Sequence, residues 1–151
     1  MIDVSSHIEI RRAREDVGAY TFNLDNAREW FGNLRSLEWL TPPPLAVRSR
    51  IRVATELFGH SLKATYEIVS LSPAEHLAMR ADRPFPIEMR YLLESITAAS
   101  TRVTIRGRVD PGGFLSFLGP MIADGLRELY RDDLVRLKKL LENERPSRAA
   151  F

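Results

Sequence analysis

The 151-residue sequence contains no cysteine. The chain therefore cannot form disulfides, use a thiolate nucleophile or bind a metal through sulfur. No apolar run approaches the roughly 18–20 residues that span a bilayer, and the first residues do not combine a basic region with an apolar core as a secretory signal does. We expect no stable membrane insertion, and a cytoplasmic location is the default expectation.

The sequence also lacks a strong charge of one sign, because its 22 basic and 20 acidic residues leave a net charge of +2. Arginines alternate along two stretches, 48–52 and 102–108, a pattern that suits either an anionic partner or the solvated faces of strands. Acidic residues share these faces, at Glu56, Glu67 and Glu88. This mixture favours solvated faces and argues against nucleic acid as a partner.

Familiar catalytic and metal-binding motifs are absent as well. No two of the three histidines have metal-ligand spacing, and there is no glycine-rich phosphate loop or Gly-x-Ser-x-Gly sequence. Asp132 and Asp133 are adjacent carboxylates in a predicted helix, where neighbouring side chains diverge by about 100°. We therefore expect these two carboxylates on a solvated face rather than in a dyad, and we expect neither metal nor cofactor.

What the sequence does contain is apolar and polar alternation over most of its first 110 residues, which is typical of strands with one buried face. The pattern predicts about seven strands, with two short helices near 15–22 and 26–32 after the first strand. Asn26 and Glu29 are spaced as in a capping box at the start of the second helix. Hairpin-length turns, such as Phe58-Gly59-His60-Ser61, make the later strands an antiparallel meander.

The pattern changes at Pro111-Gly112-Gly113, and residues 120–144 are predicted to form one long helix. Its apolar residues fall mostly three and four apart, which gives one buried stripe. No helical pattern occurs between residues 40 and 110, so this helix is the only element that can cover the sheet. The fold class is α+β, and one helix on a large antiparallel sheet can leave a cavity between the two.

The order of these elements, together with particular residues, resembles the helix-grip superfamily of START domains, polyketide cyclases and birch-pollen allergen-like proteins. The bacterial polyketide cyclase/dehydrase-like branch is the most similar. The residues that carry the resemblance are Ser6-His7-Ile8-Glu9-Ile10, Leu24-Asp25 through Trp30, Gly59-His60, Ser72-Pro73, and Asp133 to Lys138 with Leu141-Glu142.

The resemblance implies a curved antiparallel sheet wrapped around a long C-terminal helix. It covers nearly the whole chain, and we expect one domain over residues 1–144 with a flexible tail at 145–151. One departure is Arg14 after Ala13, where the family usually has proline; that substitution is tolerable because proline at this position only presets φ. The family has no shared catalytic motif, so the fold does not define the function.

Bulky apolar side chains on the inner face of the sheet and at the start of the final helix suit the binding of an apolar molecule. The alternative is that they only pack as core. We expect an opening near Trp39, Phe85 and Phe117, and hydroxyl groups that orient a ligand at Tyr66 and Tyr91. The predicted ligand-binding residues are Trp39, Tyr66, Met79, Phe85, Met89, Tyr91, Phe117, Leu118, Met121 and Ile122.

The segment from Phe114 to Gly125 is apolar on nearly every side, beyond what packing on one face requires. We interpret it as a mobile gate of the cavity, with Gly112-Gly113 as its hinge. The competing interpretation is a homodimer contact.

Three functions agree with this pattern. The leading hypothesis is the binding or transport of a hydrophobic small molecule, such as a lipid, polyketide or isoprenoid. The second is a cyclase or dehydratase whose candidate acid–base residues are Tyr66, Tyr91 and Asp82, although ionisable residues are sparse on the inner face. The third is a protein-interaction module that uses the apolar gate.

Overall fold

The computed structural model describes residues 1–112 and 118–143. Its strands are β1 (Ile2–Ile10), β2 (Leu34–Trp39), β3 (Arg50–Leu57), β4 (His60–Ser72), β5 (His76–Ala81), β6 (Ile87–Thr97) and β7 (Ser100–Val109). Its helices are α1 (Arg14–Thr21), the short 3-10 helix η1 (Leu24–Asn26), α2 (Ala27–Trp30) and α3 (Gly119–Asn143).

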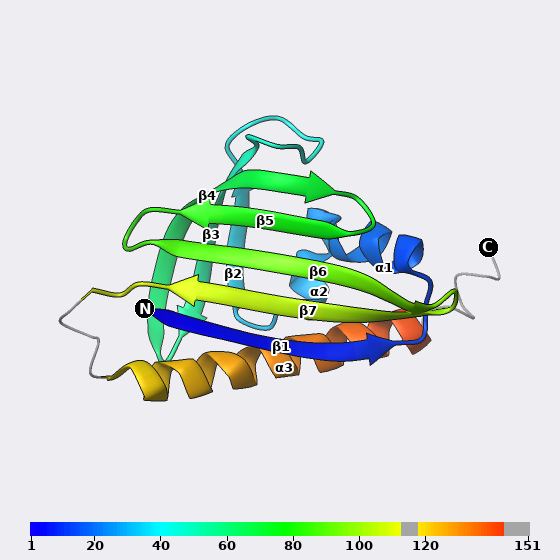
Figure 1. Cartoon of the computed structure of the whole chain (residues 1–151). Helices are drawn as coiled ribbons and strands as arrows, with labels where there is room; N and C mark the ends of the chain where they lie inside the picture. The colour runs from blue at the N-terminus through cyan, green and yellow to red at the C-terminus, as the bar shows by residue number, and fades with distance from the viewer. Residues whose placement is uncertain (113–117, 144–151) are drawn as a thin grey trace.

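All the strands join in one seven-stranded antiparallel sheet with the order β1-β7-β6-β5-β4-β3-β2. The sheet curves, so that β2 and β3 rise across the ends of the flatter strands β5 to β7 (Figure 1). This arrangement confirms the predicted sheet, the two short helices after the first strand and the long final helix. The predicted tail, 145–151, lies outside the described residues.

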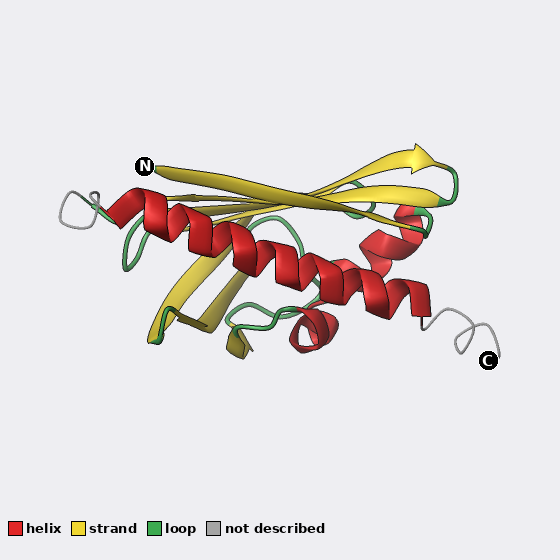
Figure 2. Ribbon diagram, turned by 90° about the horizontal axis from the view of Figure 1, so that it is seen from below, coloured by secondary structure: helices red, strands yellow, loops and turns green. Residues whose placement is uncertain are grey.

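Helix α3 runs across one face of the sheet, with α1 and α2 near its C-terminal end (Figure 2). Its buried apolar residues recur at helical spacing and join the main core: Leu126, Tyr130, Leu134, Leu137 and Leu141. A fully buried leucine side chain contributes about 1.5–3 kcal/mol to folding. This stripe therefore holds the helix against the sheet, as the sequence period predicts. None of the helices in residues 1–112 and 118–143 is both long and apolar enough to cross a membrane.

The outer face of the sheet carries charges that oppose one another across the strands. Arg102 of β7 lies between Glu9 of β1 and Glu94 of β6 in the strand register. Arg106 likewise donates to the Asp3 carboxylate of β1 at 2.6 Å. Opposite charges on facing residues stabilise a sheet modestly, and they leave this face close to neutral, in agreement with the predicted solvated faces.

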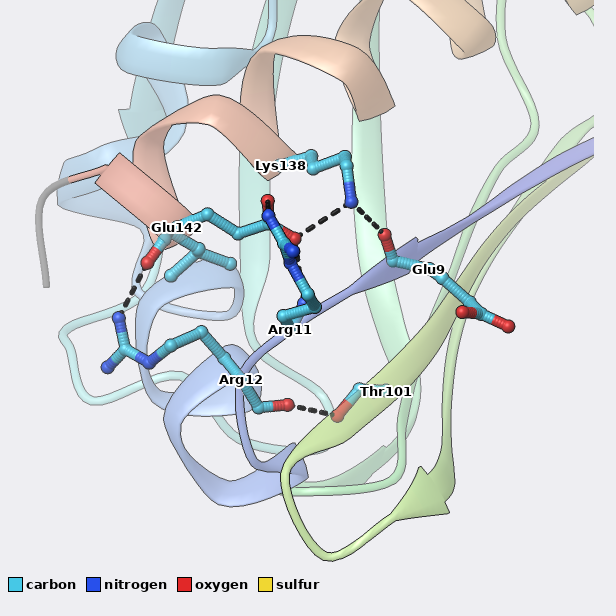
Figure 3. Close-up of polar contacts among 7 residues, drawn as sticks. Glu9, Arg11, Arg12, Thr101, Lys138 and Glu142 are labelled. Carbon is cyan, nitrogen blue, oxygen red and sulfur yellow. Dashed lines mark hydrogen bonds and ion pairs between the residues drawn. The ribbon is translucent and has the colours of Figure 1, made fainter.

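The C-terminal end of α3 is tied to the end of β1. The Glu142 carboxylate accepts from the Arg11 backbone N–H at 2.8 Å and from Lys138 Nζ at 2.8 Å, and Lys138 Nζ also donates to the Glu9 carbonyl at 2.7 Å (Figure 3). These bonds fix the position of the helix along the sheet. Along the sheet α3 packs chiefly against β1, and side chains from its first half line the cavity described below.

Candidate functional site

A cavity of about 390 Å³ lies between the sheet and the helices. Its walls come from β2 to β7, from the ends of α1, η1 and α2, and from α3 between Ile122 and Asp133. Alternation along the strands explains this lining, because every second side chain points to the same face. The volume lies within the roughly 300–1,000 Å³ of small-molecule sites.

Six of the ten predicted ligand-binding residues line this cavity. Met79 and Met89 lie opposite each other on β5 and β6, and Leu77 and Tyr91 form the opposing pair two positions along. Contact of these residues with a ligand remains a prediction. The six are Tyr66, Met79, Phe85, Met89, Tyr91 and Ile122.

Three of the other four lie outside the lining, and the fourth is not among the described residues. Met121 is 71% exposed, because it diverges by about 100° from Ile122, which faces the cavity. Trp39 and Leu118 are half-buried outside the lining, and Phe117 lies outside the described residues. Asp82, the predicted acid–base candidate at a strand end, is exposed and also outside the lining.

The cavity reaches the surface at the hairpin between β3 and β4. The exposed lining residues are Phe58, His60 and Ser61, all at this hairpin. Phe58 is 55% exposed, and its ring lies so close to Gly125 of α3 that a Cβ atom there would collide with it. This hairpin and α3 therefore border a mouth; of the three residues expected near an opening, Phe85 is in the lining, Trp39 is not, and Phe117 lies outside the described residues.

The predicted gate and its hinge are only partly described. Gly112 has a φ of 88°, a conformation that favours glycine. Gly113 and residues 114–117 lie outside the described residues, so the mobile gate and the dimer contact remain predictions.

The inner end of the cavity is polar. Tyr66, Tyr91 and Tyr130 line it together with Asp133. The Tyr130 hydroxyl lies against the backbone of Gly107 on β7, where a Cβ atom would collide with it, and 3.7 Å from the Met89 sulfur. Sequence patterning placed Tyr130 in the buried stripe of the helix but did not indicate that its hydroxyl reaches the cavity.

Asp133 corrects the expectation that both adjacent carboxylates are solvated. It is 5% exposed because it follows Tyr130 by three positions and precedes Leu137 by four, which places it on the buried side of α3. Its Oδ1 accepts from the Gly32 backbone N–H at 3.0 Å and from Arg136 Nη1 at 3.0 Å. Helical spacing from Tyr130 was the signal that could have identified this residue.

Burial is the main cause of the shifted pKa values of the three tyrosines and of Asp133. It raises the pKa of Asp133 to about 6, although the Gly32 N–H and Arg136 act to lower that pKa. Burial also raises the pKa of Tyr66 to about 12, and the pKa values of Tyr91 and Tyr130 are likewise raised, mainly by burial. The tyrosines are therefore neutral hydrogen-bonding groups at physiological pH, and Asp133 is the group that titrates near neutrality.

In residues 1–112 and 118–143, no three histidine or carboxylate side chains come close enough to hold a metal ion. The arrangement instead provides apolar walls with a few convergent polar groups at one end. Such a site holds the apolar body of a molecule by burial and orients it through its polar end.

The fold and this cavity define a helix-grip protein, and comparison with known proteins agrees. Residues 1–142 match the family described as "Polyketide cyclase / dehydrase and lipid transport". The chain belongs to this family. A search of curated proteins gave no match.

Solved structures of similar fold include an aromatase/cyclase and a START protein. The Zhui aromatase/cyclase from Streptomyces sp. R1128 has a TM-score of 0.79 at 13% identity, with 94% of each chain covered. A START superfamily protein from Mycobacterium smegmatis has a TM-score of 0.77 at 16% identity, with 93% of this chain and 97% of that chain covered. At these identities the likeness shows the fold alone.

Proposed function

We propose that this protein binds or carries a hydrophobic small molecule, of lipid, polyketide or isoprenoid type, in the cavity between the sheet and α3. The observation that carries the proposal is a cavity of about 390 Å³ with almost entirely apolar walls and a mouth at the β3–β4 hairpin. The family description, which includes lipid transport, supports the same function.

Affinity would come from burial of the ligand's apolar surface. Each Å² removed from water contributes roughly 25 cal/mol before the costs of association. Met79 and Met89, which oppose each other on the wall, have flexible side chains that adapt to the shape of a bulky ligand.

Copurification tests this function directly. Native mass spectrometry of the protein purified from cells should show a bound hydrophobic species. Leu62→Trp, which fills the cavity from β4, should remove that species. Val69→Trp is the matched control, because Val69 lies on the same strand, 37% exposed and outside the lining.

Two results would contradict the proposal. One is the absence of any bound species together with no binding of added apolar probes. The other is equal retention of the ligand by the Leu62→Trp and Val69→Trp proteins, which would place the ligand elsewhere.

A second candidate function is cyclase or dehydratase chemistry on a polyketide-like substrate. Asp133 favours it, because a carboxyl group with a pKa of about 6 inside a cavity can exchange protons near neutral pH. Loss of turnover in Asp133→Asn with retained ligand affinity would support an enzyme. Turnover that survives in Asp133→Asn, Tyr66→Phe and Tyr91→Phe would remove these three residues from any catalytic role.

A further inference from the structure

The inner end of the cavity has one charged group and no cation in its lining. Asp133 is the only carboxylate among the described lining residues, which include no lysine or arginine. Arg136 lies nearby, but it donates to Asp133 Oδ1 and to the Trp30 carbonyl, each at 3.0 Å. Among the described lining residues, His60 alone has a basic side chain, and it is exposed at the mouth.

One carboxylate oxygen of Asp133, Oδ2, has no hydrogen-bond partner among the described residues. The hydrogen bonds from Gly32 and Arg136 both go to Oδ1. Among residues 1–112 and 118–143, no hydrogen bond engages Oδ2. A carboxylate oxygen is an acceptor with two lone pairs, so Oδ2 is available to a donor that enters the cavity.

The neighbouring hydroxyls add further unused hydrogen-bonding capacity. Within the described residues, no hydrogen bond engages the hydroxyl of Tyr66 or Tyr91, and Tyr130 contacts only the weak acceptor Met89 sulfur. The side chains of Tyr66, Tyr91, Tyr130 and Asp133 all line the same cavity. The hydroxyls of Tyr66 and Tyr91 are not among the buried unpartnered atoms, so a ligand in the cavity can reach them; among the described lining residues, the buried atoms without a partner are Thr21 Oγ1 and Trp30 Nε1.

We propose that the cavity selects amphiphiles whose inner end carries a neutral hydrogen-bond donor, such as a hydroxyl or phenol, and discriminates against an anionic group at that position. This inference rests on the proposed function. The hydroxyl donates to Asp133 Oδ2 and accepts from a tyrosine hydroxyl. An anion in the same place meets the Asp133 charge at a site whose described lining holds no lysine or arginine, so the anion binds only at the cost of their repulsion or of protonating Asp133.

The depth of the cavity allows this orientation. Gly125, beside the mouth, precedes Asp133 by eight residues, which corresponds to about 12 Å along the helix. A bicyclic aromatic molecule spans much of that distance. Its apolar rings would lie beside the methionines while its hydroxyl reaches Asp133.

Three rigid probes of matched shape test the inference: naphthalene, 2-naphthol and 2-naphthoate, titrated in neutral buffer, where Asp133 is ionised. We expect wild-type protein to bind 2-naphthol about tenfold more tightly than naphthalene, since a hydrogen bond to a charged group contributes that much or more. It should bind 2-naphthoate more weakly than naphthalene.

Asp133→Asn makes the test specific, because the amide oxygen can still accept from Gly32 and Arg136 while the amide nitrogen replaces Oδ2 as a donor. We expect the affinity ratio of 2-naphthoate to 2-naphthol to rise at least about tenfold, with naphthalene affinity unchanged. Asp132→Asn is the control, because it removes the same charge from an exposed neighbour and should leave all three affinities unchanged.

The outcomes separate this inference from the function on which it rests. If naphthalene fails to bind the wild-type protein, the binding function itself is in doubt. If naphthalene binds but the ratio of 2-naphthoate to 2-naphthol is the same in wild type and Asp133→Asn, the selectivity is wrong and the cavity remains a general apolar site. An equal change in Asp132→Asn would assign the effect to net charge and overturn the role of Asp133.

Discussion

At the scale of single residues, the contact between Gly107 and Tyr130 positions one polar group of the cavity. A Cβ atom at Gly107 would collide with the Tyr130 hydroxyl and lie 3.0 Å from its Cζ atom. The glycine thus leaves space on β7 for a side chain from α3. Its φ is not in the left-handed region, so the requirement at this position is space and not backbone freedom.

Gly107→Ala should therefore destabilise the protein by about 1–3 kcal/mol, the usual cost of overpacking. The cost should be smaller in a Tyr130→Phe background, because the hydroxyl that meets the new methyl group is gone. Denaturant unfolding of the four proteins in this double-mutant cycle measures the difference. If Gly107→Ala lowers the free energy of unfolding equally in the wild-type and Tyr130→Phe proteins, the sheet and not the Tyr130 side chain moves to relieve the collision.

The sequence predicted single residues well where the period of two applied. Tyr66, Met79, Met89 and Tyr91 all line the cavity because they alternate along strands whose inner face is buried. Asp133 was missed because a charged residue beside another in a helix is usually solvated, and the Gly32 N–H that donates to it is brought close only by folding, although Arg136 is a local partner three residues along the helix. Partners distant in sequence are not visible in a local pattern.

At the scale of elements, the mouth is formed by the β3–β4 hairpin and α3. Phe58 and Gly59 form a two-residue turn in which both residues have positive φ, 52° and 81°. Such a turn suits the twist of a hairpin, and here it also places the Phe58 ring against Gly125. The sequence predicted the turn but not its contact with the helix, because that contact depends on how the sheet curves.

Gly125→Ala should displace the Phe58 ring from α3 and widen the mouth. Given the proposed binding function, dissociation of 2-naphthol should become faster while the contacts at the inner end are retained, and stopped-flow fluorescence measures this rate. Gly119→Ala is the matched control, because a Cβ atom there meets no atom of the described residues within 4 Å. If both variants release the probe at the wild-type rate, Phe58 does not limit exit.

Element existence was predicted more reliably than element ends. The expected capping box at Asn26 is wrong, because Asn26 caps no helix with its side chain and Glu29 instead accepts from the Tyr20 hydroxyl. Asn23 performs the capping role three residues earlier, where its side chain accepts from the Asp25 N–H at 3.0 Å. Both asparagines suit a cap, and the 3-10 helix that decides between them has too short a pattern to recognise.

At the scale of the whole molecule, two buried or partly buried carboxyl groups on α3 respond to pH in opposite ways. Burial raises the pKa of Asp133 to about 6. Burial acts to raise the pKa of Glu142 as well, but hydrogen bonds from Lys138 and Arg11 hold it below its usual value. Glu142 therefore stabilises the fold at pH values above the pKa of its unfolded state and loses this contribution as pH falls. Ionised Asp133 destabilises the fold at high pH, and this penalty disappears as pH falls.

The contribution of Asp133 follows from proton linkage. Between its unfolded pKa of 3.8 and its folded pKa of about 6, the folded state binds the proton more tightly, so unfolding releases it and stability falls as pH rises. Above pH 6 the penalty of the buried charge is fully present, and two pKa units correspond to roughly 3 kcal/mol as an upper bound.

Asp133→Asn should therefore gain stability relative to wild type as pH rises from about 4 to 7, by about 1–3 kcal/mol over that window. Denaturant unfolding of both proteins at a series of pH values measures the gap. Asp132→Asn, at an exposed position, should show no such widening. A gap that stays constant across the window would mean that Asp133 titrates alike in the folded and unfolded chain. Its buried carboxylate would then be too well solvated to discriminate among ligands by charge.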